Sequence, residues 1–285
     1  MTRKEVSYMK KLLFLAMVML LVLSFSSCFL IGKVPMTLLI DDTHNNSYDF
    51  DGYGSEDFFE KLEAIALAEG YSVSYSSSAG FSPEKYGVVL IAAPATSYTT
   101  QDKSKVKSLL DKGGKVILLG EWYWYYDNTL LNSIASYVGS NITFANYQLS
   151  DSTNNYQSTS SWLTTTEITA HAVTSGLNKL ALFASTALNV SGSAQIVVHA
   201  ESTAGTASTF SLDAGFQVTS VLSSEVDVAP SVTNLGLVAV SEVGGGKVVA
   251  VTDATLFAND VYSLITGDYI DVHDNAALFK NILNW

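Results

Sequence analysis

Polar side chains of the kinds that bind sugars, small polar ligands or divalent cations follow several apolar runs of this sequence. They lie in four stretches: residues 41–46 (DDTHNN), 121–123 (EWY), 252–260 and 273–275 (HDN). In an open parallel sheet, the loops at the carboxyl ends of the strands form a common crevice. We therefore expect these stretches to converge into a polar pocket. The candidate ligand-binding residues are Asp41, His44, Asn46, Glu121, Trp122, Tyr123, Asp253, Asn259, Asp260, His273, Asp274 and Asn275.

The same side chains also have an ordinary structural interpretation. Aspartate and asparagine cap helices and tie turns, which fits Asp274 before the last helical pattern and Asn259-Asp260 in a turn. His44 and His273 with an aspartate could bind a metal ion, but no fixed ligand spacing supports such a site. We predict no metal site and no cofactor, and the pocket and structural interpretations both stay open.

Catalysis would need a nucleophile or a suitably spaced pair of carboxylates. The one cysteine, Cys28, leaves no catalytic thiol further along the chain, and no G-x-S-x-G nucleophile motif is present. Glu121 and Asp253 could serve as the paired carboxylates of a glycoside hydrolase if their separation were suitable, which sequence does not give. A carboxylate-dependent hydrolase acting on saccharide or another envelope polymer is therefore the alternative, and a binding role without catalysis is favoured.

An aromatic run, residues 122–126 (WYWYY), follows Glu121 directly. Exposed aromatic rings stack on sugars and are enriched at the energetic centres of protein interfaces. The alternative is a lid that packs over the edge of the sheet. Five consecutive rings cannot all point inward, so at least two should be exposed.

The composition indicates a globular, acidic protein. The chain of 285 residues is 48% hydrophobic and 15% charged, which suits a buried core and argues against global disorder. Its 15 basic and 27 acidic residues give a net charge of −12. Without residues 1–27, which hold four basic residues and one acidic residue, the balance is 11 against 26, or −15. Such a surface repels phosphates, so we predict no nucleic-acid partner.

The N-terminus has the pattern of a secretory signal. Two lysines precede an apolar run from Leu12 to Leu23, and small residues then lead to Cys28. The pattern resembles a bacterial lipoprotein signal, residues 1–28, with Cys28 as the lipidated residue and residues 29–35 as a short tether. The alternative is an uncleaved anchor, since residues 12–32 carry no charge over 21 positions. Either interpretation places the body outside the cytoplasmic membrane, in the cell envelope.

Alternating apolar runs and helical patterns predict an α/β fold. Strands are expected at 36–40, 71–75, 87–91, 115–119 and 142–144, and helices at 56–69, from Thr99 or Thr100 to Gly113, from Asp127 to Tyr137, and at 275–285. This order predicts a mostly parallel sheet with helices on both faces. Residues 180–251 predict a β-rich C-terminal extension of that sheet. His171 and His199 lie in β-rich stretches and are interpreted as structural. Residues 150–162 and 201–229 are expected as loops or insertions.

Several segments in a fixed order resemble a known family. They are TLLIDDTHNN, EKYGVVLIAAP, TTQDKSKVKSLLDKGGKVILLGE, LLNSIASYVGSNITF, HAVTSGL, GGGKVVAVTDATLFAND and HDNAALFKNILNW. Together they are similar to the glutamine-amidotransferase-like domains of uncharacterised extracytoplasmic proteins. Related domains occur with gliding-motility-type ABC transporters and in intraflagellar-transport proteins. One departure is Ala172, where the family often has proline after the histidine.

The resemblance implies a flavodoxin-like sheet over residues 36–285, in a role that is usually non-catalytic. Amidotransferases of this superfamily carry a cysteine just after the strand that matches residues 116–119, and here Gly120 and Glu121 occupy that turn. Amidotransferase activity is therefore excluded on chemical grounds. The expected function is that of a membrane-anchored lipoprotein that binds a saccharide or an envelope protein, with an ABC-type transporter as one candidate partner.

Overall fold

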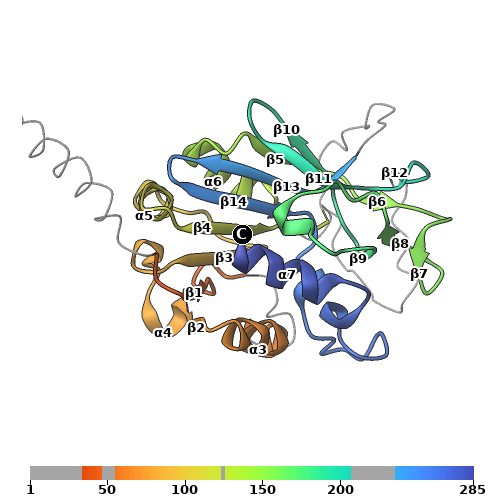
Figure 1. The fold of residues 1–285 in the computed structure, drawn as a ribbon, viewed down its shortest axis with the longest axis horizontal. Coiled ribbons are helices and arrows are strands. Elements are labelled where there is room, and N and C mark those ends of the chain that lie inside the picture. Colours follow the sequence, from red (N-terminus) through yellow and green to blue (C-terminus); the bar gives the residue numbers. More distant parts are fainter. Residues whose placement is uncertain (1–33, 47–54, 123–125, 207–234) are drawn as a thin grey trace, which may run out of the picture. The chain divides into compact units, whose positions relative to one another are not determined.

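The apolar runs assemble into one large sheet in the unit Met36–Trp285 (Figure 1). The structure is a computed structural model, and it describes residues 34–46, 55–122, 126–206 and 235–285. Within these residues nine strands form the sheet in the order β2-β1-β3-β4-β14-β13-β10-β5, with β11 also paired to β13. The parallel strands are β2 (Ser72–Tyr75), β1 (Thr37–Ile40), β3 (Val88–Ala92), β4 (Lys115–Leu119) and β14 (Gly246–Val251). The antiparallel strands are β13 (Gly236–Val243), β10 (Leu188–Val190), β5 (Ile142–Phe144) and β11 (Gln195–His199).

The central strands are buried on both faces because their runs are continuously apolar. Every residue of β3 and β4 is buried, as expected for parallel strands between two helical layers. Alternation divides the side chains between two core clusters: Leu38 and Ile40 belong to one, and Leu39 belongs to the other. The fold class expected from sequence, an α/β fold with a mostly parallel sheet and helices on both faces, is therefore confirmed.

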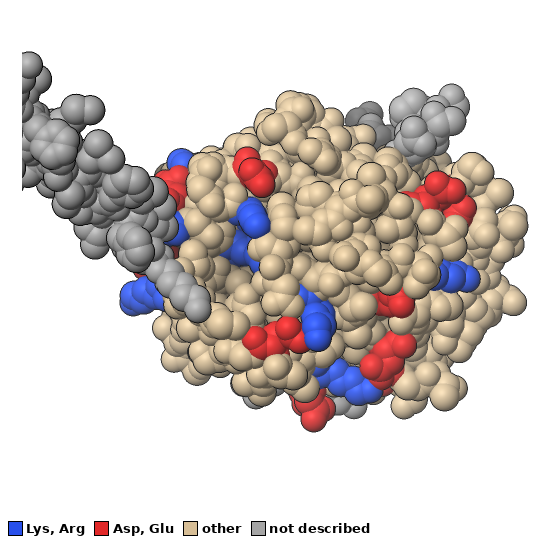
Figure 2. All heavy atoms as spheres, in the orientation of Figure 1, with Lys and Arg blue, Asp and Glu red and all other residues tan. Residues whose placement is uncertain are grey.

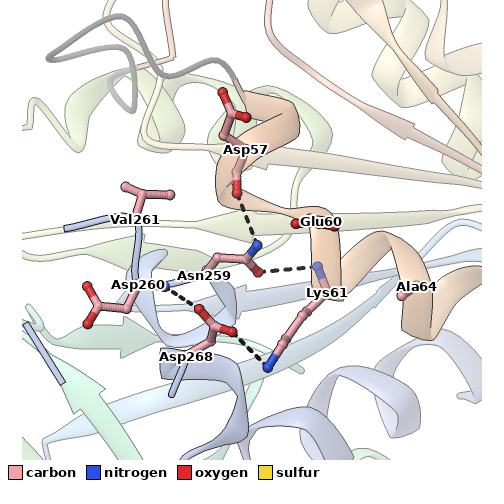
Figure 3. A pocket seen from close by; sticks show the side chains of 8 residues that line it. All are labelled: Asp57, Glu60, Lys61, Ala64, Asn259, Asp260, Val261 and Asp268. Atoms are coloured by element: carbon pink, nitrogen blue, oxygen red, sulfur yellow. Dashed lines mark hydrogen bonds and ion pairs between the residues drawn. The ribbon is translucent and has the colours of Figure 1, made fainter. Parts of the chain in front are cut away.

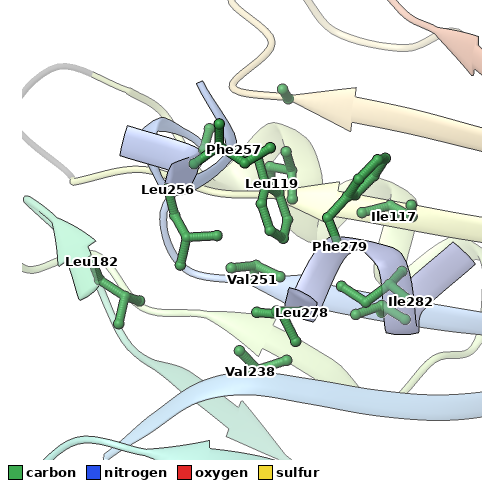
Figure 4. Packing of buried hydrophobic residues seen from close by; sticks show 14 of the residues in the cluster. Ile117, Leu119, Leu182, Val238, Val251, Leu256, Phe257, Leu278, Phe279 and Ile282 are labelled. Carbon is green, nitrogen blue, oxygen red and sulfur yellow. The ribbon is translucent and has the colours of Figure 1, made fainter. Parts of the chain in front are cut away.

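Helices α3 (Glu60–Ala68) and α7 (Asn275–Asn284) cover one face, and α5 (Thr100–Asp111) and α6 (Thr129–Val138) cover the other. On the α7 face, Phe279 packs against Phe257 with ring centroids 5.4 Å apart, among the leucine and valine side chains of the strands (Figure 4). Of the two expected starts of the α5 helix, Thr99 is the cap, and it forms a reciprocal capping box with Asp102. Between β2 and β3 lie the short helices α4 (Ser76–Ala79) and η1 (Pro83–Lys85).

The predicted helix over 56–69 is in fact interrupted. Helix α2 (Ser55–Phe58) ends before Phe59, and α3 begins after it. The backbone carbonyl groups of Asp57 and Phe58 accept hydrogen bonds from the side chain and backbone of Asn259, at 3.1 and 2.7 Å. These carbonyl groups are thereby diverted to a residue about 200 positions away, which a local helical pattern cannot reveal.

The segment 150–162, expected as a loop or insertion, contains strand structure. Strand β7 (Asn155–Tyr156) and strand β8 (Thr159–Thr165) pair in a small sheet with β9 (Leu180–Phe183). Trp162 lies opposite Phe183 in this sheet, and their rings are 5.5 Å apart. This cross-strand pairing overrides the polar local composition. Strand β6 (Leu149–Ser150) pairs with β12 (Gly205–Thr206), and residues 207–229 of the second expected loop lie outside the described residues.

The N-terminal expectations are not addressed by the fold. Residues 1–28 with Cys28, and most of the tether 29–35, lie outside the described residues. Among the residues that are described, no helix has the length and apolar character needed to cross a membrane.

Candidate functional site

The carboxyl edge of the sheet carries the acidic residues that the sequence places after the strands. Asp41 follows β1 directly, while Glu121 and Asp253 each lie two residues beyond β4 and β14. The last residues of these two strands, Leu119 and Val251, are paired in parallel register. Glu121 and Asp253 therefore continue the same row and are brought side by side by the strand pairing.

Glu121 and Asp253 form a buried acid pair. Their exposed fractions are 2% and 0%, and their carboxyl groups hydrogen-bond to each other. Burial, followed by the charge of Asp253, raises the pKa of Glu121 well above its ordinary value. Burial raises the pKa of Asp253 to about 7, despite hydrogen bonds that favour its charged form. The pair therefore holds at least one shared proton at neutral pH.

Three oxygens of the pair bind groups of the protein itself, whereas Oδ1 of Asp253 is buried and accepts no hydrogen bond from the described residues. Glu121 accepts hydrogen bonds from the backbone N–H of Trp122 at 3.2 Å and from the hydroxyl of Thr255 at 3.1 Å. Asp253 accepts the backbone N–H of Phe183 at the end of β9. Glu121, Asp253 and the nearby Asp260 also contribute, after burial, to raising the pKa of Tyr269. This arrangement joins three strand ends and leaves no carboxylate exposed to act as a nucleophile.

The turn after Glu121 is fastened by Asn128. Its side-chain amide donates to the backbone carbonyl of Glu121 at 2.6 Å, and its side-chain oxygen accepts the backbone N–H of Glu121 at 3.2 Å. Trp122 is half-buried, and Tyr123 lies outside the described residues. The choice between an aromatic platform and a lid therefore stays a prediction.

Asp41 is the centre of a second buried cluster, on the α5 side of the sheet. Its carboxylate accepts hydrogen bonds from the hydroxyl groups of Tyr98 and of Ser76, the latter at 2.8 Å. Nδ1 of His44 lies 2.8 Å from Oδ2, the oxygen that also accepts the Tyr98 hydroxyl, whereas Ser76 donates to Oδ1. Burial acts to raise the pKa of Asp41, but the contacts with His44, Tyr98 and Ser76 outweigh it and hold the pKa below its ordinary value.

The ring of His44 is fixed in orientation by this cluster. It stacks on Tyr98 with 3.6 Å between ring centroids and meets the edge of Phe81 at 4.9 Å. Its Nε2 lies 3.9 Å from a carboxylate oxygen of Asp102, at the start of α5. Asn46 donates from its side chain to the carbonyl of Ala92 at 2.6 Å, which ties the loop to the end of β3. Asp41 and Asn46 thus have structural roles here.

A pocket of about 440 Å³ lies where the loop after β14 meets the start of α3 (Figure 3). Asn259 holds the two parts together, because its side chain binds the carbonyl of Asp57 and the backbone N–H of Lys61. The Lys61 ammonium lies 2.7 Å from Asp268, which also accepts the backbone N–H of Asp260 at 2.7 Å. The pocket is lined by Asp57, Glu60, Lys61, Ala64, Asn259, Asp260, Val261 and Asp268.

The stretch 273–275 mainly ties α7 to the rest of the fold. Asp274 accepts the backbone N–H groups of Asn178 and Lys179 at 2.7 and 3.0 Å. The ring of His273 meets the edge of Tyr156 at 6.0 Å, and burial lowers the pKa of His273. Asn275 is fully buried and satisfies both backbone groups of Ala181, at 3.0 and 3.1 Å, and the carbonyl of Tyr269 at 3.0 Å. The structural interpretation considered for these residues fits best.

Replacing Asn275 by alanine is expected to lower the free energy of unfolding by about 2 kcal/mol, because buried backbone groups of Ala181 and Tyr269 lose their partner. Denaturant unfolding followed by circular dichroism measures this. The matched control is Asn281→Ala on the same helix, whose exposed side chain makes a single hydrogen bond to the carbonyl of Ser175. Equal losses of unfolding free energy in the two variants would contradict the role of Asn275 in binding the buried backbone groups of Ala181 and Tyr269.

The candidate residues therefore divide into separate groups rather than one pocket. Asp41 and His44 pack with the α5-side core through Tyr98 and Phe81, whereas Glu121 and Asp253 lie on the α7 side beside Tyr269. Across the described ranges, His44 and His273 form no three-ligand metal group with a carboxylate. Sequence reasoning missed Lys61, Asp268, Tyr98 and Thr255, because each reaches its group through the tertiary structure.

Comparisons with known proteins agree with this architecture. The sequence profile described as Domain of unknown function (DUF4350) matches residues 47–283. The mmIFT52 N-terminal domain has a similar structure, with a TM-score of 0.59, 14% identity, and coverage of 87% of this chain and 96% of that chain. A comparison with curated proteins gives no match.

Two further solved structures are similar. A cytoplasmic protein from Salmonella typhimurium LT2 has a TM-score of 0.51, 12% identity, and coverage of 87% of this chain and 98% of that chain. A putative ThuA-like protein from Bacteroides uniformis ATCC 8492 has a TM-score of 0.47, 14% identity, and coverage of 87% and 91%. At these identities the similarities concern the fold alone. The fold-level resemblance to an intraflagellar-transport domain, expected from sequence, is confirmed.

Proposed function

Because this chain belongs to the family described as Domain of unknown function (DUF4350), and because the carboxyl group of Glu121 in the turn after β4 is buried and hydrogen-bonded, we propose that it is a binding protein without catalytic activity. It is anchored by a lipid at Cys28 on the extracytoplasmic side of the membrane. Its ligand is a saccharide or an envelope protein. A transporter of the envelope is the partner that the family resemblance suggests.

The state of Glu121 is the observation that carries the proposal. A glycosidase needs its two carboxyl groups about 5 Å or more apart, with the substrate between them. Glu121 and Asp253 instead hydrogen-bond to each other, and both are buried. Their remaining contacts are with the protein's own backbone and with Thr255. The pair therefore suits a structural brace of the sheet edge and does not suit acid–base attack on a bound sugar.

The pocket between α3 and the loop after β14 is the favoured binding place. Its 440 Å³ fall within the usual range of small-ligand sites, about 300–1,000 Å³. It offers carboxylates from Asp260 and Asp268 and an ammonium from Lys61. Sugar hydroxyl groups both donate and accept hydrogen bonds, so they can engage groups of both kinds. This chemistry supports a hydroxyl-rich ligand.

Replacing Lys61 by glutamine is expected to weaken ligand binding about tenfold, the effect of one charge-assisted hydrogen bond. The fold should persist, because the Lys61 side chain is 42% exposed and its ion pairs contribute little to stability. Binding to immobilised peptidoglycan and lipopolysaccharide oligosaccharides, measured with the full chain in detergent, tests this. Lys107→Gln is the matched control, since Lys107 pairs with Asp111 at 2.8 Å on another helix.

Two results would contradict this proposal. One is an equal loss of binding in the Lys61 and Lys107 variants, which would remove the pocket from the site. The other is turnover of a saccharide by the wild type that is abolished by Glu121→Gln, which would establish the hydrolase alternative instead.

Replacing Cys28 by alanine is expected to abolish fatty-acid labelling of the protein in bacterial cells and to block processing of the signal. The physical reason is that Cys28 is the sole thiol to which a lipid could be attached. Metabolic labelling with a radioactive fatty acid, followed by gel electrophoresis, checks both effects. A wild-type protein that is processed normally but carries no label would contradict lipidation.

A further inference from the structure

A second cavity lies at the opposite, amino-terminal edge of the sheet. Its volume is about 290 Å³, and its walls include His171, Gln195, Glu242 and Trp285. Val240 and Glu242 are alternate residues of β13, and their cross-strand partners are Gln195 and Lys247, so the four side chains share one face of the sheet. Trp285, at the end of α7, packs over this face, with the Lys247 ammonium 4.6 Å from its ring centroid.

Several polar atoms around this cavity have no hydrogen-bond partner among the described residues. The backbone N–H of Val173 donates to Nδ1 of His171 at 3.2 Å, so in the neutral ring the proton is on Nε2. Burial and the charge of Lys247 lower the pKa of His171, which keeps the ring neutral at pH 7. In the part of the chain that is described, Nε2 of His171 and the indole N–H of Trp285 have no hydrogen-bond partner. The side chains of Gln195 and Glu242 have none either.

The charges around the cavity select the class of ligand. Glu242 disfavours an anion in the cavity, and the Lys247 ammonium on the adjacent strand disfavours a cation. A neutral ligand with several hydroxyl groups meets neither penalty. It can accept hydrogen bonds from His171 and Trp285 and donate to Glu242, while its carbon atoms contact the apolar side chain of Val240.

We propose that this cavity is a second binding site, specific for one neutral sugar ring or a polyol of that size. Its volume lies at the small end of ligand pockets, which suits a single ring rather than an oligosaccharide. The site is independent of the pocket around Asn259, because it lies at the other edge of the sheet and shares no lining residue with it.

The test uses the full chain in detergent with glucose, galactose, N-acetylglucosamine and glycerol as probes. Saturation-transfer NMR and isothermal calorimetry should detect binding of at least one of them. Glu242→Gln and Trp285→Phe should each weaken that binding about five- to tenfold, the effect of one hydrogen bond. Lys107→Gln, on α5 and outside the lining of both cavities, should leave it unchanged. Thermal melting verifies the fold of each variant. If Trp285→Phe is unstable, Glu242→Gln alone tests the sugar site. This substitution should not disturb the fold, because Glu242 is exposed and makes no ion pair among the described residues.

Three results would overturn the inference. The first is that none of the four probes binds the wild type. The second is binding that Glu242→Gln leaves unchanged. The third is binding that Lys61→Gln abolishes while Glu242→Gln does not, which would place the sugar in the Asn259 pocket and so support the proposed function alone. A failure of the proposed function is a different result and appears in the oligosaccharide assay, as equal losses of binding in the Lys61→Gln and Lys107→Gln variants.

Discussion

Replacing Glu121 by glutamine is expected to make the protein more stable at pH 8 and to flatten the pH dependence of its stability. In the wild type, the pKa values of Glu121 and Asp253 are higher in the folded state than their ordinary values of 4.5 and 3.8. Between about pH 4 and pH 7 the folded state therefore binds more protons than the unfolded state. The free energy of unfolding must fall as pH rises through this window.

The variant removes the contribution of Glu121 and retains that of Asp253, whose pKa is raised mainly by burial. The Asp253 carboxyl group gives the scale of one such contribution. Its pKa rises from 3.8 to about 7, and each unit corresponds to about 1.4 kcal/mol, so the loss between pH 4 and pH 8 is on the order of 4 kcal/mol. Glutamine at position 121 carries no charge, and its amide can donate to Asp253. We expect a gain of roughly 1–3 kcal/mol at pH 8 and little change at pH 4.

Urea unfolding of the wild type and variant between pH 4 and pH 8 measures this difference. Comparing the two proteins cancels groups that shift in the opposite direction, such as Asp41, whose pKa is lowered. Glu242→Gln is the matched control, because it makes the same change at an exposed position. Parallel pH profiles for the wild type and Glu121→Gln would show that the two carboxyl groups do not share a proton.

Replacing Gly246 by alanine is expected to lower the free energy of unfolding by about 3 kcal/mol. A Cβ atom at this position would lie 2.5 Å from the carbonyl oxygen of Gly114 and 2.7 Å from two backbone atoms of Leu110. Backbone atoms cannot rotate away as a side chain would, so the end of α5 and the β13–β14 hairpin must separate. The parallel pairing that places Asp253 beside Glu121 begins at this end of β14.

The control for this prediction is Gly205→Ala in β12, where an added Cβ has no atom within 4 Å. Thermal or urea unfolding of both variants measures the difference. A loss at position 246 no larger than that at position 205 would mean that α5 and the hairpin can shift without cost.

Local sequence patterns were sufficient for the elements whose stability is local or wholly apolar. Residues 38–40 and 116–119 lie in buried strands because continuous apolar residues must be covered on both faces. The start of α5 follows from Thr99 and Asp102, which are three residues apart and bond each other's backbone. The glycine run 244–246 forms the tight turn between β13 and β14, with Gly244 at φ +61°.

Elements that depend on distant partners were not predictable in this way. The interruption at Phe59 results from Asn259, and β8 is a strand because it pairs with β9. The same holds for the candidate site. Sequence placed Asp41, Glu121 and Asp253 after strands, but only the strand order shows which of them become neighbours.

The sequence by itself determined the acidic, α/β character of the domain and the positions of Asp41, Glu121 and Asp253 after strands. It also determined that glutamate stands at position 121, where amidotransferases carry the cysteine nucleophile. The tertiary structure alone decided that Glu121 and Asp253 form a buried pair, that Asp41 and His44 belong to the other face, and that Asn259 borders a pocket with Lys61. The physical reason is range. Apolar patterning and capping act over a few residues, whereas sharing a proton or lining a pocket requires strands and loops more than 100 positions apart to be brought into contact.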